Sequence, residues 1–329
     1  MDEIRAIIHA HGRSLQSTIK PSYKIFASLL LQNEKHIKSI TPRTVPYGTH
    51  PRQTLDIYQS TNEPRNAPML LFLYGGGFIR GDKILSSVPE GLVYRNLGTF
   101  FATRGFTTVI ADYRRVNSAI GGEDAVFPSG GKDVSLVLEW AETFDPTARR
   151  DLFIMGNSAG GVHLTTFLLL PEFFQQRERL LSGVPSIVWK GNILLSVPFH
   201  FSSMTSGMWD MLPTYYGSAS DIEKNCPLGL LRAIKRTRKS REETCIPNTI
   251  TLAGEYDPVD DILEPGRTFV ALCNEVWETG MELTLLDGHN HVSPFLALSS
   301  GDTAGENWAG RVITWMHAQS SKSRDLYGP

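Results

Sequence analysis

The chain has 329 residues, of which 41% are hydrophobic, and its formal net charge is −2 at pH 7. That length and apolar content suit a large α/β domain with a substantial core, and the near balance of charge excludes a general attraction to nucleic acid or acidic membranes. Three irregularly spaced cysteines, Cys226, Cys245 and Cys273, indicate free thiols in a reducing compartment rather than a disulfide framework.

The amino-terminal segment predicts helices rather than a targeting signal. Residues 1–20 are rich in charged and histidine side chains and lack the long apolar block of a secretory signal. Apolar residues recur at helical spacing over residues 3–40, beginning with Ile4, Ile7 and Ile8. Since no run in the sequence reaches the length of a membrane span, we expect a cytoplasmic protein.

A glycine-rich loop follows the first strongly apolar strand. The strand at 69–73 leads into Gly75, Gly76 and Gly77, and Phe78 comes next. Three glycines let the backbone bend tightly and turn N–H groups toward an open site, as acyl transfer requires for the developing oxyanion. The loop lacks the Gly-Lys-Ser/Thr ending of a Walker loop and the third glycine of a dinucleotide fingerprint.

A serine within a G-x-S-x-G pentapeptide is the strongest functional signal. Residues 156–160 read Gly-Asn-Ser-Ala-Gly, directly after the apolar run 152–155 and before a helix-like stretch at 162–168. A strand, a cramped glycine turn and a helix form the context in which Ser158 would project its hydroxyl above a sheet edge. The strand and helix favour a nucleophile over a purely structural turn.

An acid that could support this serine follows a later strand. The β-rich stretch 247–254 is followed at once by Glu255 and Asp257, with Asp260 and Asp261 close behind. Any of these four carboxylates could orient a catalytic base, although Asp260 and Asp261 also suit the start of the helix that follows.

Two histidines are candidates for the base. His289 and His291 follow the apolar strand near 282–286. Zinc would need three or four convergent ligands, and no cysteine or carboxylate set at ligand spacing accompanies the pair, so we expect no metal. Either histidine could accept the serine proton.

These motifs together resemble one protein family. The loop at 74–78 (Y-G-G-G-F), the turn at 156–161 (G-N-S-A-G-G) and Asp257-Pro258 are similar to motifs of the hormone-sensitive-lipase-like branch of the α/β-hydrolases. The stretch 53–58 (Q-T-L-D-I-Y) also resembles related feruloyl-esterase-like and kynurenine-formamidase-like members. The resemblance extends from about Val45 to Trp315.

The resemblance implies a complete catalytic set without a cofactor. Its serine–acid–histidine order favours Asp257 as the acid and His291 as the base, with His289 as the alternative. Tyr74 stands where the family usually has a loop-bracing histidine, which leaves the geometry of the loop open. The implied triad is Ser158, Asp257 and His291, and the implied oxyanion donors are the N–H groups of Gly76, Gly77 and Ala159.

The element pattern predicts one α/β-hydrolase domain over residues 1–329. Eight strands alternate with helices, which implies a mostly parallel eight-stranded sheet with helices on both faces. The family implies a helical cap from about 1–42, and residues 198–245 break the alternation and would supply its second piece. Because aromatic and methionine side chains are frequent there, we predict a substrate pocket lined by Phe78, Trp209, Tyr215 and Tyr216.

A basic run at 232–241 holds six lysine and arginine residues, followed by Glu242 and Glu243. Without a nucleic-acid-binding motif, this pattern favours a solvated helix face. The expected partner is a small-molecule ester, with no nucleic acid and no membrane span, and a homodimer remains open.

The sequence thus predicts a serine hydrolase that cleaves small to medium hydrophobic, aryl or lactone esters through an acyl-enzyme. Three alternatives remain: arylformamidase-like amide hydrolysis, acyl transfer to an alcohol, and non-catalytic binding of a small ligand on the same fold.

Overall fold

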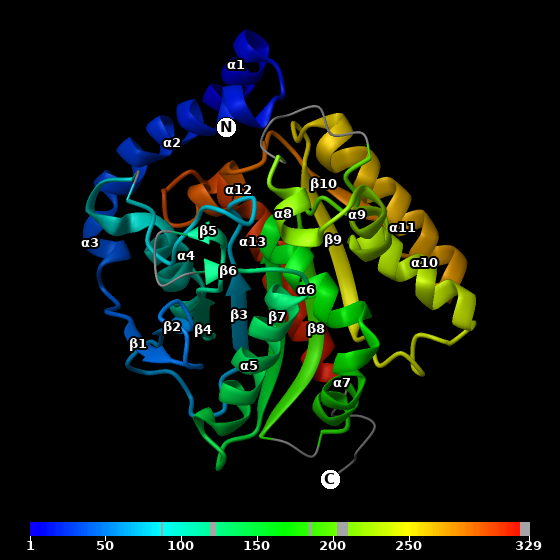
Figure 1. Ribbon diagram of the computed structural model, residues 1–329. Coiled ribbons are helices and arrows are strands. Elements are labelled where there is room, and N and C mark those ends of the chain that lie inside the picture. Colours follow the sequence, from blue (N-terminus) through cyan, green and yellow to red (C-terminus); the bar gives the residue numbers. More distant parts are fainter. Residues whose placement is uncertain (87, 119–122, 184–185, 203–209, 323–329) are drawn as a thin grey trace.

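The computed structural model describes residues 1–86, 88–118, 123–183, 186–202 and 210–322. Its centre is an eight-stranded sheet in the order β1-β2-β4-β3-β7-β8-β9-β10 (Figure 1). The pairs β1–β2 and β2–β4 are antiparallel, and all the other pairs are parallel. The sheet strands are β1 (Arg43–Pro46), β2 (Thr54–Tyr58), β3 (Met69–Leu73), β4 (Thr107–Ala111), β7 (Arg150–Asn157), β8 (Ile187–Leu195), β9 (Asn248–Gly254) and β10 (Leu283–Leu286).

Helices cover both faces of this sheet, with α5 and α6 in front of it and α13 behind it in Figure 1. The helices are α1 (Asp2–His11), α2 (Leu15–Gln32), α3 (Glu34–Ile37), α4 (Leu92–Ala102), α5 (Ser129–Phe144), α6 (Ala159–Leu169), α7 (Phe174–Leu181), α8 (Leu212–Tyr216), α9 (Ala219–Asn225), α10 (Pro227–Thr237), α11 (Glu264–Trp277), α12 (Ser293–Ala297) and α13 (Thr303–Lys322).

The side chains of β3 point alternately into two apolar cores, which explains why helices cover both faces of the sheet. Met69, Leu71 and Leu73 belong to the apolar core that also contains residues of α5 and α6, whereas Leu70 and Phe72 belong to the core shared with α4 and α13. Successive side chains of a strand point to opposite faces, so a strand that is apolar throughout needs a layer on each side. This arrangement confirms the predicted α/β-hydrolase fold class.

Two details differ from the prediction. The sequence pattern predicts a strand over residues 191–197, whereas β8 begins at Ile187 and ends at Leu195. A small antiparallel pair, β5 (Val116–Ser118) and β6 (Glu123–Asp124), lies outside the main sheet and was not expected. Both segments lie outside the glycine motifs, and the sequence pattern of these segments predicts secondary structure less clearly.

The described residues between β8 and β9 form three helices, α8, α9 and α10. Ser218 caps α9 in a capping box with Asp221, and Pro227 begins α10. Leu228, Leu231 and Ile234 of α10 are buried, and the helix packs against α6 and α11. The α10 part of this region therefore joins the helical layer over the sheet.

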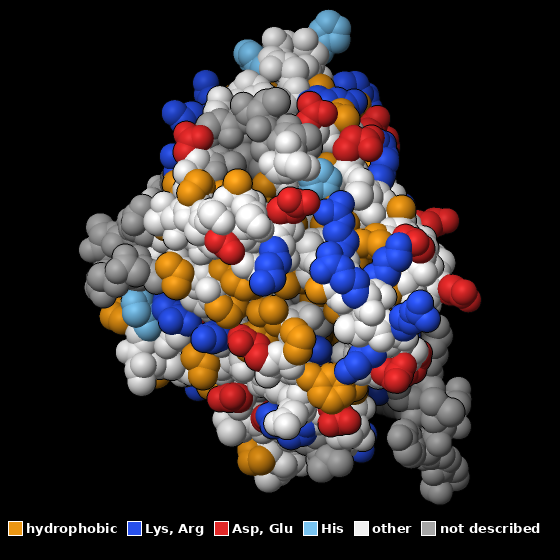
Figure 2. Space-filling view, turned by 45° about the vertical axis from the view of Figure 1, so that its right-hand side comes forward, with side chains coloured by type: hydrophobic (Ala, Val, Ile, Leu, Met, Phe, Trp, Pro, Cys, Tyr) orange, Lys and Arg blue, Asp and Glu red, His pale blue; other side chains and the backbone are white. Residues whose placement is uncertain are grey.

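The basic run falls largely on the outer side of α10. Arg232 and Lys235 are exposed and form ion pairs with Glu223 and Glu275, respectively. Figure 2 shows this side of the molecule, where basic and acidic side chains are interspersed rather than gathered into a field of one sign.

Candidate active site

Ser158 occupies a sharp turn between β7 and α6, at the carboxyl edge of the sheet. Its backbone angles, φ 51° and ψ −121°, are unusual for a residue with a side chain. The surrounding glycines permit the turn: a Cβ at Gly160 would lie 2.2 Å from the carbonyl oxygen of Leu73, and one at Gly156 would lie 2.6 Å from Cα of Gly161. The pentapeptide thus packs the first turn of α6 directly onto the end of β3.

His291 lies between Ser158 and Asp257. Its Nε2 is 3.0 Å from Ser158 Oγ, and its Nδ1 is 2.7 Å from Asp257 Oδ1. These distances match the hydrogen bonds that link a nucleophile, a base and an orienting acid. Ser158 and His291 are each 5% exposed, and Asp257 is completely buried, so the hydrogen-bonded chain is largely shielded from solvent.

The second oxygen of Asp257 is held by two further donors. Its Oδ2 accepts hydrogen bonds from Ser196 Oγ at 2.6 Å and from the Gly254 N–H at 2.7 Å. Ser196 follows β8 with φ 51°, and nothing in the sequence pattern marked it. Because Asp257 is completely buried, these two donors provide its Oδ2 with the hydrogen-bond partners that a buried polar atom needs.

The other acids near Asp257 have different surroundings. Glu255 accepts a hydrogen bond from the Gly288 N–H at 2.8 Å, and Asp260 is exposed. Asp261 lies in the short π-helix Val259–Leu263 beyond the turn. Of the four sequence candidates, Asp257 is the one that reaches His291.

His289 occupies a different environment from His291. Its Nδ1 lies 2.9 Å from Ser293 Oγ at the start of α12, and burial lowers the pKa of the imidazole to about 4. The structure therefore brings His291, and not His289, to the serine. Sequence spacing left both histidines open because they are separated by a single residue.

The glycine loop passes directly beside Ser158. A Cβ at Gly75 would lie 2.9 Å from Ser158 Cβ, so only glycine allows this approach. Gly76 and Gly77 have φ values of 153° and 59°, and the Gly76 carbonyl accepts a hydrogen bond from the Arg80 N–H at 2.9 Å. Ala159 begins α6, where first-turn N–H groups have no partner within the helix.

A buried polar network braces this loop from below. The Tyr74 hydroxyl donates to Asp112, whose Oδ1 also accepts from Arg52 Nη2 at 2.7 Å. The Tyr113 hydroxyl donates to the Tyr74 carbonyl at 2.7 Å, and the two rings stack with centroids 4.7 Å apart. Tyr74 thus supplies the bracing expected of the residue at this position.

Desolvation dominates the electrostatics of that network. Burial raises the pKa of the Asp112 carboxyl to about 6, although the nearby Arg52 guanidinium and the Tyr74 hydrogen bond act in the opposite direction. Burial also raises the pKa of the Tyr74 hydroxyl well above its ordinary value, so this group remains a proton donor.

The amino-terminal helices contact the loops that carry the acid and the histidine. Arg13, between α1 and α2, donates to the Glu255 carbonyl at 2.7 Å. Asn290, adjacent to His291, donates through Nδ2 to Ser22 Oγ of α2 at 2.8 Å, and Ser22 and Asn290 are both buried. No sequence motif indicated these contacts, which connect the loops of Asp257 and His291 to the α1–α2 segment.

Aromatic side chains gather next to the glycine loop. Phe78 stacks on Tyr215 of α8 with ring centroids 4.8 Å apart and lies 5.4 Å from the ring of His163. Tyr216 lies 4.8 Å from Tyr215 in an edge-on arrangement. We call Phe78, His163, Tyr215 and Tyr216 the aromatic cluster. Trp209, the fourth residue of the predicted pocket, lies outside the described residues.

The aromatic cluster contains buried polar atoms without protein partners among the described residues, namely Nε2 of His163 and the hydroxyl of Tyr216. Burial lowers the pKa of His163 to about 3, so its ring is neutral. A cavity of about 420 Å³ adjoins the cluster at Phe201, whose ring centroid is 6.4 Å from that of Phe78. Leu212, Cys226 and Leu228 contribute apolar side chains to its wall.

Comparison with known proteins shows what this chain is similar to. The family model BD-FAE matches residues 55–179. A probable isoprenylcysteine alpha-carbonyl methylesterase, ICME, from Oryza sativa subsp. japonica is 30% identical over 295 residues, which cover 86% of this chain and 65% of that protein. The corresponding Arabidopsis thaliana protein is 30% identical over 147 residues, covering 45% of this chain and 30% of that protein.

Solved structures share the fold at lower sequence identity. Esterase B from Lactobacillus Rhamnosis superposes with a TM-score of 0.65 at 15% identity, with 99% of each chain covered. A thermostable esterase from Pseudomonas putida ECU1011 gives a TM-score of 0.62 at 17% identity, with 99% of this chain and 96% of that chain covered. The fold and the serine turn are those of an α/β-hydrolase. The chain spans less than two thirds of the length of the curated relatives, and these relatives and the solved structures are named as esterases, to which the chain is similar in sequence and in fold respectively.

Among the described residues, no helix combines the length and the apolar character that crossing a bilayer requires.

Proposed function

We propose that this chain is a serine hydrolase that cleaves carboxylic esters through an acyl-enzyme. The observation that carries the proposal is the hydrogen-bonded chain from Ser158 Oγ through His291 to Asp257, with distances of 3.0 and 2.7 Å. The esterase relatives support the same chemistry.

In the proposed first step, Ser158 Oγ attacks the ester carbonyl carbon while His291 Nε2 accepts the hydroxyl proton. Asp257 keeps the other ring nitrogen protonated and stabilises the imidazolium. The carbonyl oxygen becomes an anion, which the N–H groups of Gly76, Gly77 and Ala159 would bind. Each such donor is worth about 10²–10³ in turnover.

The tetrahedral intermediate then collapses with loss of the alcohol. His291 returns its proton to the departing alkoxide, and the acyl group stays on Ser158. Water enters, gives a proton to His291 and attacks the acyl carbon. The second tetrahedral intermediate then collapses, His291 passes that proton to the departing Ser158 Oγ, and the carboxylic acid is released. Atoms balance with ester and water as the only reactants, so the proposed cycle requires no cofactor.

We propose that the aromatic cluster and its adjoining cavity bind the apolar part of the ester. Phe78 belongs to the same loop as Gly76 and Gly77, two of the proposed oxyanion donors, and Tyr215 and Tyr216 belong to the segment 198–245 that would contribute to the cap. Aromatic and aliphatic walls suit hydrophobic or aryl esters. The rice and Arabidopsis relatives, named as isoprenylcysteine methylesterases, point to methyl esters of strongly apolar acids as one candidate class.

The amino-terminal segment 1–42 would form the other part of the cap. Its contacts to Glu255 and Asn290 support a second task for this segment, which is to hold the acid and histidine loops in register. Cap and hydrolase core would then act as one domain over residues 1–329.

A substrate panel tests the proposal. The purified chain and its Ser158→Ala variant would be offered p-nitrophenyl acetate, butyrate and octanoate, the methyl ester of N-acetyl-S-farnesylcysteine, an aryl lactone and N-formylkynurenine. We expect serine-dependent hydrolysis of the esters that exceeds hydrolysis of the formamide. Preference for N-formylkynurenine would favour an arylformamidase, and acyl transfer to added alcohol in place of hydrolysis would favour an acyltransferase. Tight binding without turnover would favour a ligand-binding protein.

A further inference from the structure

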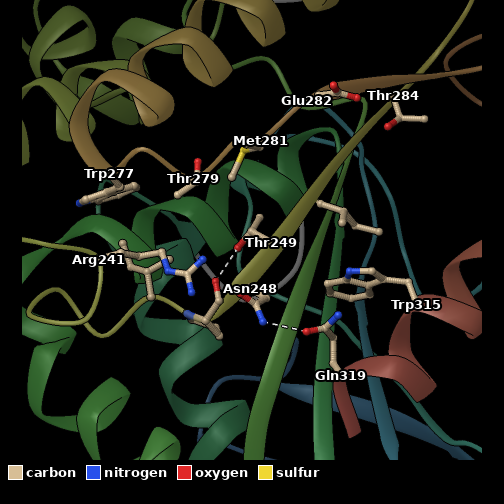
Figure 3. Close-up of a pocket in the computed structure, with 14 residues that line it drawn as sticks. Arg241, Asn248, Thr249, Trp277, Thr279, Met281, Glu282, Thr284, Trp315 and Gln319 are labelled. Atoms are coloured by element: carbon tan, nitrogen blue, oxygen red, sulfur yellow. Dashed lines mark hydrogen bonds between the residues drawn. The ribbon is translucent and has the colours of Figure 1, made fainter. Parts of the chain in front are cut away.

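A second hollow lies at the opposite edge of the sheet from Ser158, where β9 begins. It encloses about 350 Å³, and Trp277, Trp315, Arg241, Asn248 and Thr249 are among the residues that line it (Figure 3). Asn248 starts β9, whereas Asp257 follows the other end of this strand. Seven residues of strand separate the two ends by about 20 Å, so this hollow is distinct from the proposed active site.

Arg241 is the last member of the basic run and differs from the others in its surroundings. It lies beyond the end of α10 in a turn, where its backbone carbonyl accepts hydrogen bonds from Thr244 and Ile246. The side chain is half-buried, and Figure 3 shows it in the lining of the hollow, beside Asn248 and Trp277. No ion pair joins Arg241 to any residue in the part of the chain that the structure describes.

The acidic residues near Arg241 form no ion pair with it among the described residues, although two hydrogen bonds and, after them, its charge lower the pKa of the Glu242 carboxyl. Glu242 is its neighbour in the sequence, and Glu282 lines the same hollow on the side away from Arg241 in Figure 3. Both side chains are exposed. A half-buried guanidinium without a bound carboxylate can still bind an anion through paired N–H donors.

Two tryptophans give the hollow apolar walls. Trp277 ends α11 and Trp315 belongs to α13, and Figure 3 shows them on opposite sides of the hollow. Trp315 is fixed against bare strand backbone, since a Cβ at Gly191 would lie 2.4 Å from its ring. The indole N–H of Trp277 is buried and has no partner among the described residues.

The floor of the hollow is held in place by hydrogen bonds. Asn248 Nδ2 donates to Gln319 Oε1 at 2.7 Å, and Thr249 Oγ1 donates to the Pro247 carbonyl at 3.0 Å. These bonds fix polar side chains of β9 and α13 between the two tryptophans. The hollow is therefore shaped by ordered side chains, as small-molecule sites are.

We propose that this hollow is a second binding site, specific for a small organic anion with a flat apolar body, such as an aryl carboxylate. The carboxylate would pair with the Arg241 guanidinium, and the ring would pack against the indole side chains that line the hollow. The volume of about 350 Å³ suits a ligand of one or two fused rings. This proposal does not depend on the reaction at Ser158.

Calorimetric titration with two probes tests the charge requirement on the unchanged protein. The probes are 2-naphthoate and 2-naphthamide, which have the same ring system and differ in the negative charge. We expect naphthoate to bind at least about tenfold more tightly, because a charge-assisted pair with Arg241 is lost in the amide. Absence of naphthoate binding up to about 1 mM, or equal affinity for the two probes, would overturn the proposal.

Variants and a blocked active site then locate the binding. Arg241→Gln should weaken naphthoate binding about tenfold and leave naphthamide binding unchanged. Arg236→Gln, which removes an exposed charge from α10, serves as the matched control and should change neither. Protein phosphonylated at Ser158 should bind naphthoate as the free protein does. Loss of binding in the phosphonylated protein, or retention of full affinity in Arg241→Gln, would refute a site at this hollow.

Discussion

The triad region and the aromatic cluster are neighbours, yet different forces hold them. Around Asp257 each carboxylate oxygen has a hydrogen-bond donor, and His291 is held at both ring nitrogens. In the aromatic cluster, ring packing sets the arrangement, and buried polar atoms of His163 and Tyr216 lack partners among the described residues. Directional bonds fix the positions of reacting atoms, whereas packing of rings leaves a surface that can adjust to a ligand.

The largest expected effect lies in the triad region. Ser158→Ala should lower kcat for p-nitrophenyl acetate by about 10⁶-fold, because no other group can form the acyl-enzyme. The free energy of unfolding, measured in urea, should either rise or stay within about 1 kcal/mol of the native value. The reason is that alanine removes one hydroxyl and leaves the other packing contacts in place. A variant that kept turnover would remove the serine from the mechanism.

The two histidines provide a matched pair of substitutions. His291→Asn should reduce kcat by about 10⁴-fold or more, since the base that contacts Ser158 is lost. His289→Asn should reduce it by less than about tenfold, because His289 contacts Ser293 instead. Steady-state rates at saturating ester would separate the two roles, and the reverse order of effects would assign the base to His289.

Ser196 tests whether hydrogen bonds to the acid matter for turnover. Ser196→Ala removes the 2.6 Å hydrogen bond to Asp257 and leaves the one from Gly254. We expect kcat to fall roughly 10- to 100-fold, the usual cost of a lost bond to a buried charge, with little change in KM. A change confined to KM would show that Ser196 acts on substrate binding.

In the aromatic cluster, we expect the free energy of unfolding to depend on pH. His163 has a folded pKa of about 3, below the ordinary value of 6.5, because burial disfavours its charged form. Its contribution to stability is therefore complete above pH 6.5 and is lost as the pH falls toward 3, at a cost of about 2 kcal/mol by pH 5. Urea unfolding at pH 7.5 and pH 5 should show this loss in the native chain and a smaller one in His163→Gln. An identical pH dependence in the native chain and in His163→Gln would contradict the assignment of this loss to His163.

Tyr216→Phe should have the smallest effect. The hydroxyl it removes is buried without a partner among the described residues, so the free energy of unfolding should rise by up to about 1 kcal/mol. If this hydroxyl instead contacts the ester, KM would rise while stability changed little. Unfolding and kinetic measurements on the same preparation distinguish the two outcomes, and a loss of stability would show that the hydroxyl has an internal partner.

The same contrast explains what the sequence could predict. The fold class and the turn around Ser158 followed from strand periodicity and from glycines that only a tight approach requires, such as Gly160. These patterns are local, so they can be recognised in a single sequence. The choice of Asp257 and of His291 among nearby alternatives came from family resemblance, because spacing alone cannot tell which side chain turns toward the serine.

Contacts between distant segments could not be predicted in this way. Ser196 supports an acid 61 positions later in the chain, and Asn290 binds Ser22 across 268 positions. Arg241 belonged to a run that indicated a solvated helix face, and its place in a hollow lined by two tryptophans depends on where α10 ends. Each of these contacts depends on tertiary packing. A single serine, asparagine or arginine has no sequence pattern that predicts such a contact.

Covalent trapping most directly tests whether Ser158 is the activated nucleophile. The native chain would be treated with diethyl p-nitrophenyl phosphate, and the labelled peptide would be identified by mass spectrometry while esterase activity is followed. We expect one phosphoryl group per chain on Ser158, formed in step with the loss of activity, and no labelling of His291→Asn on the same timescale. Labelling at another residue, or full esterase activity in protein modified at Ser158, would contradict the proposed mechanism.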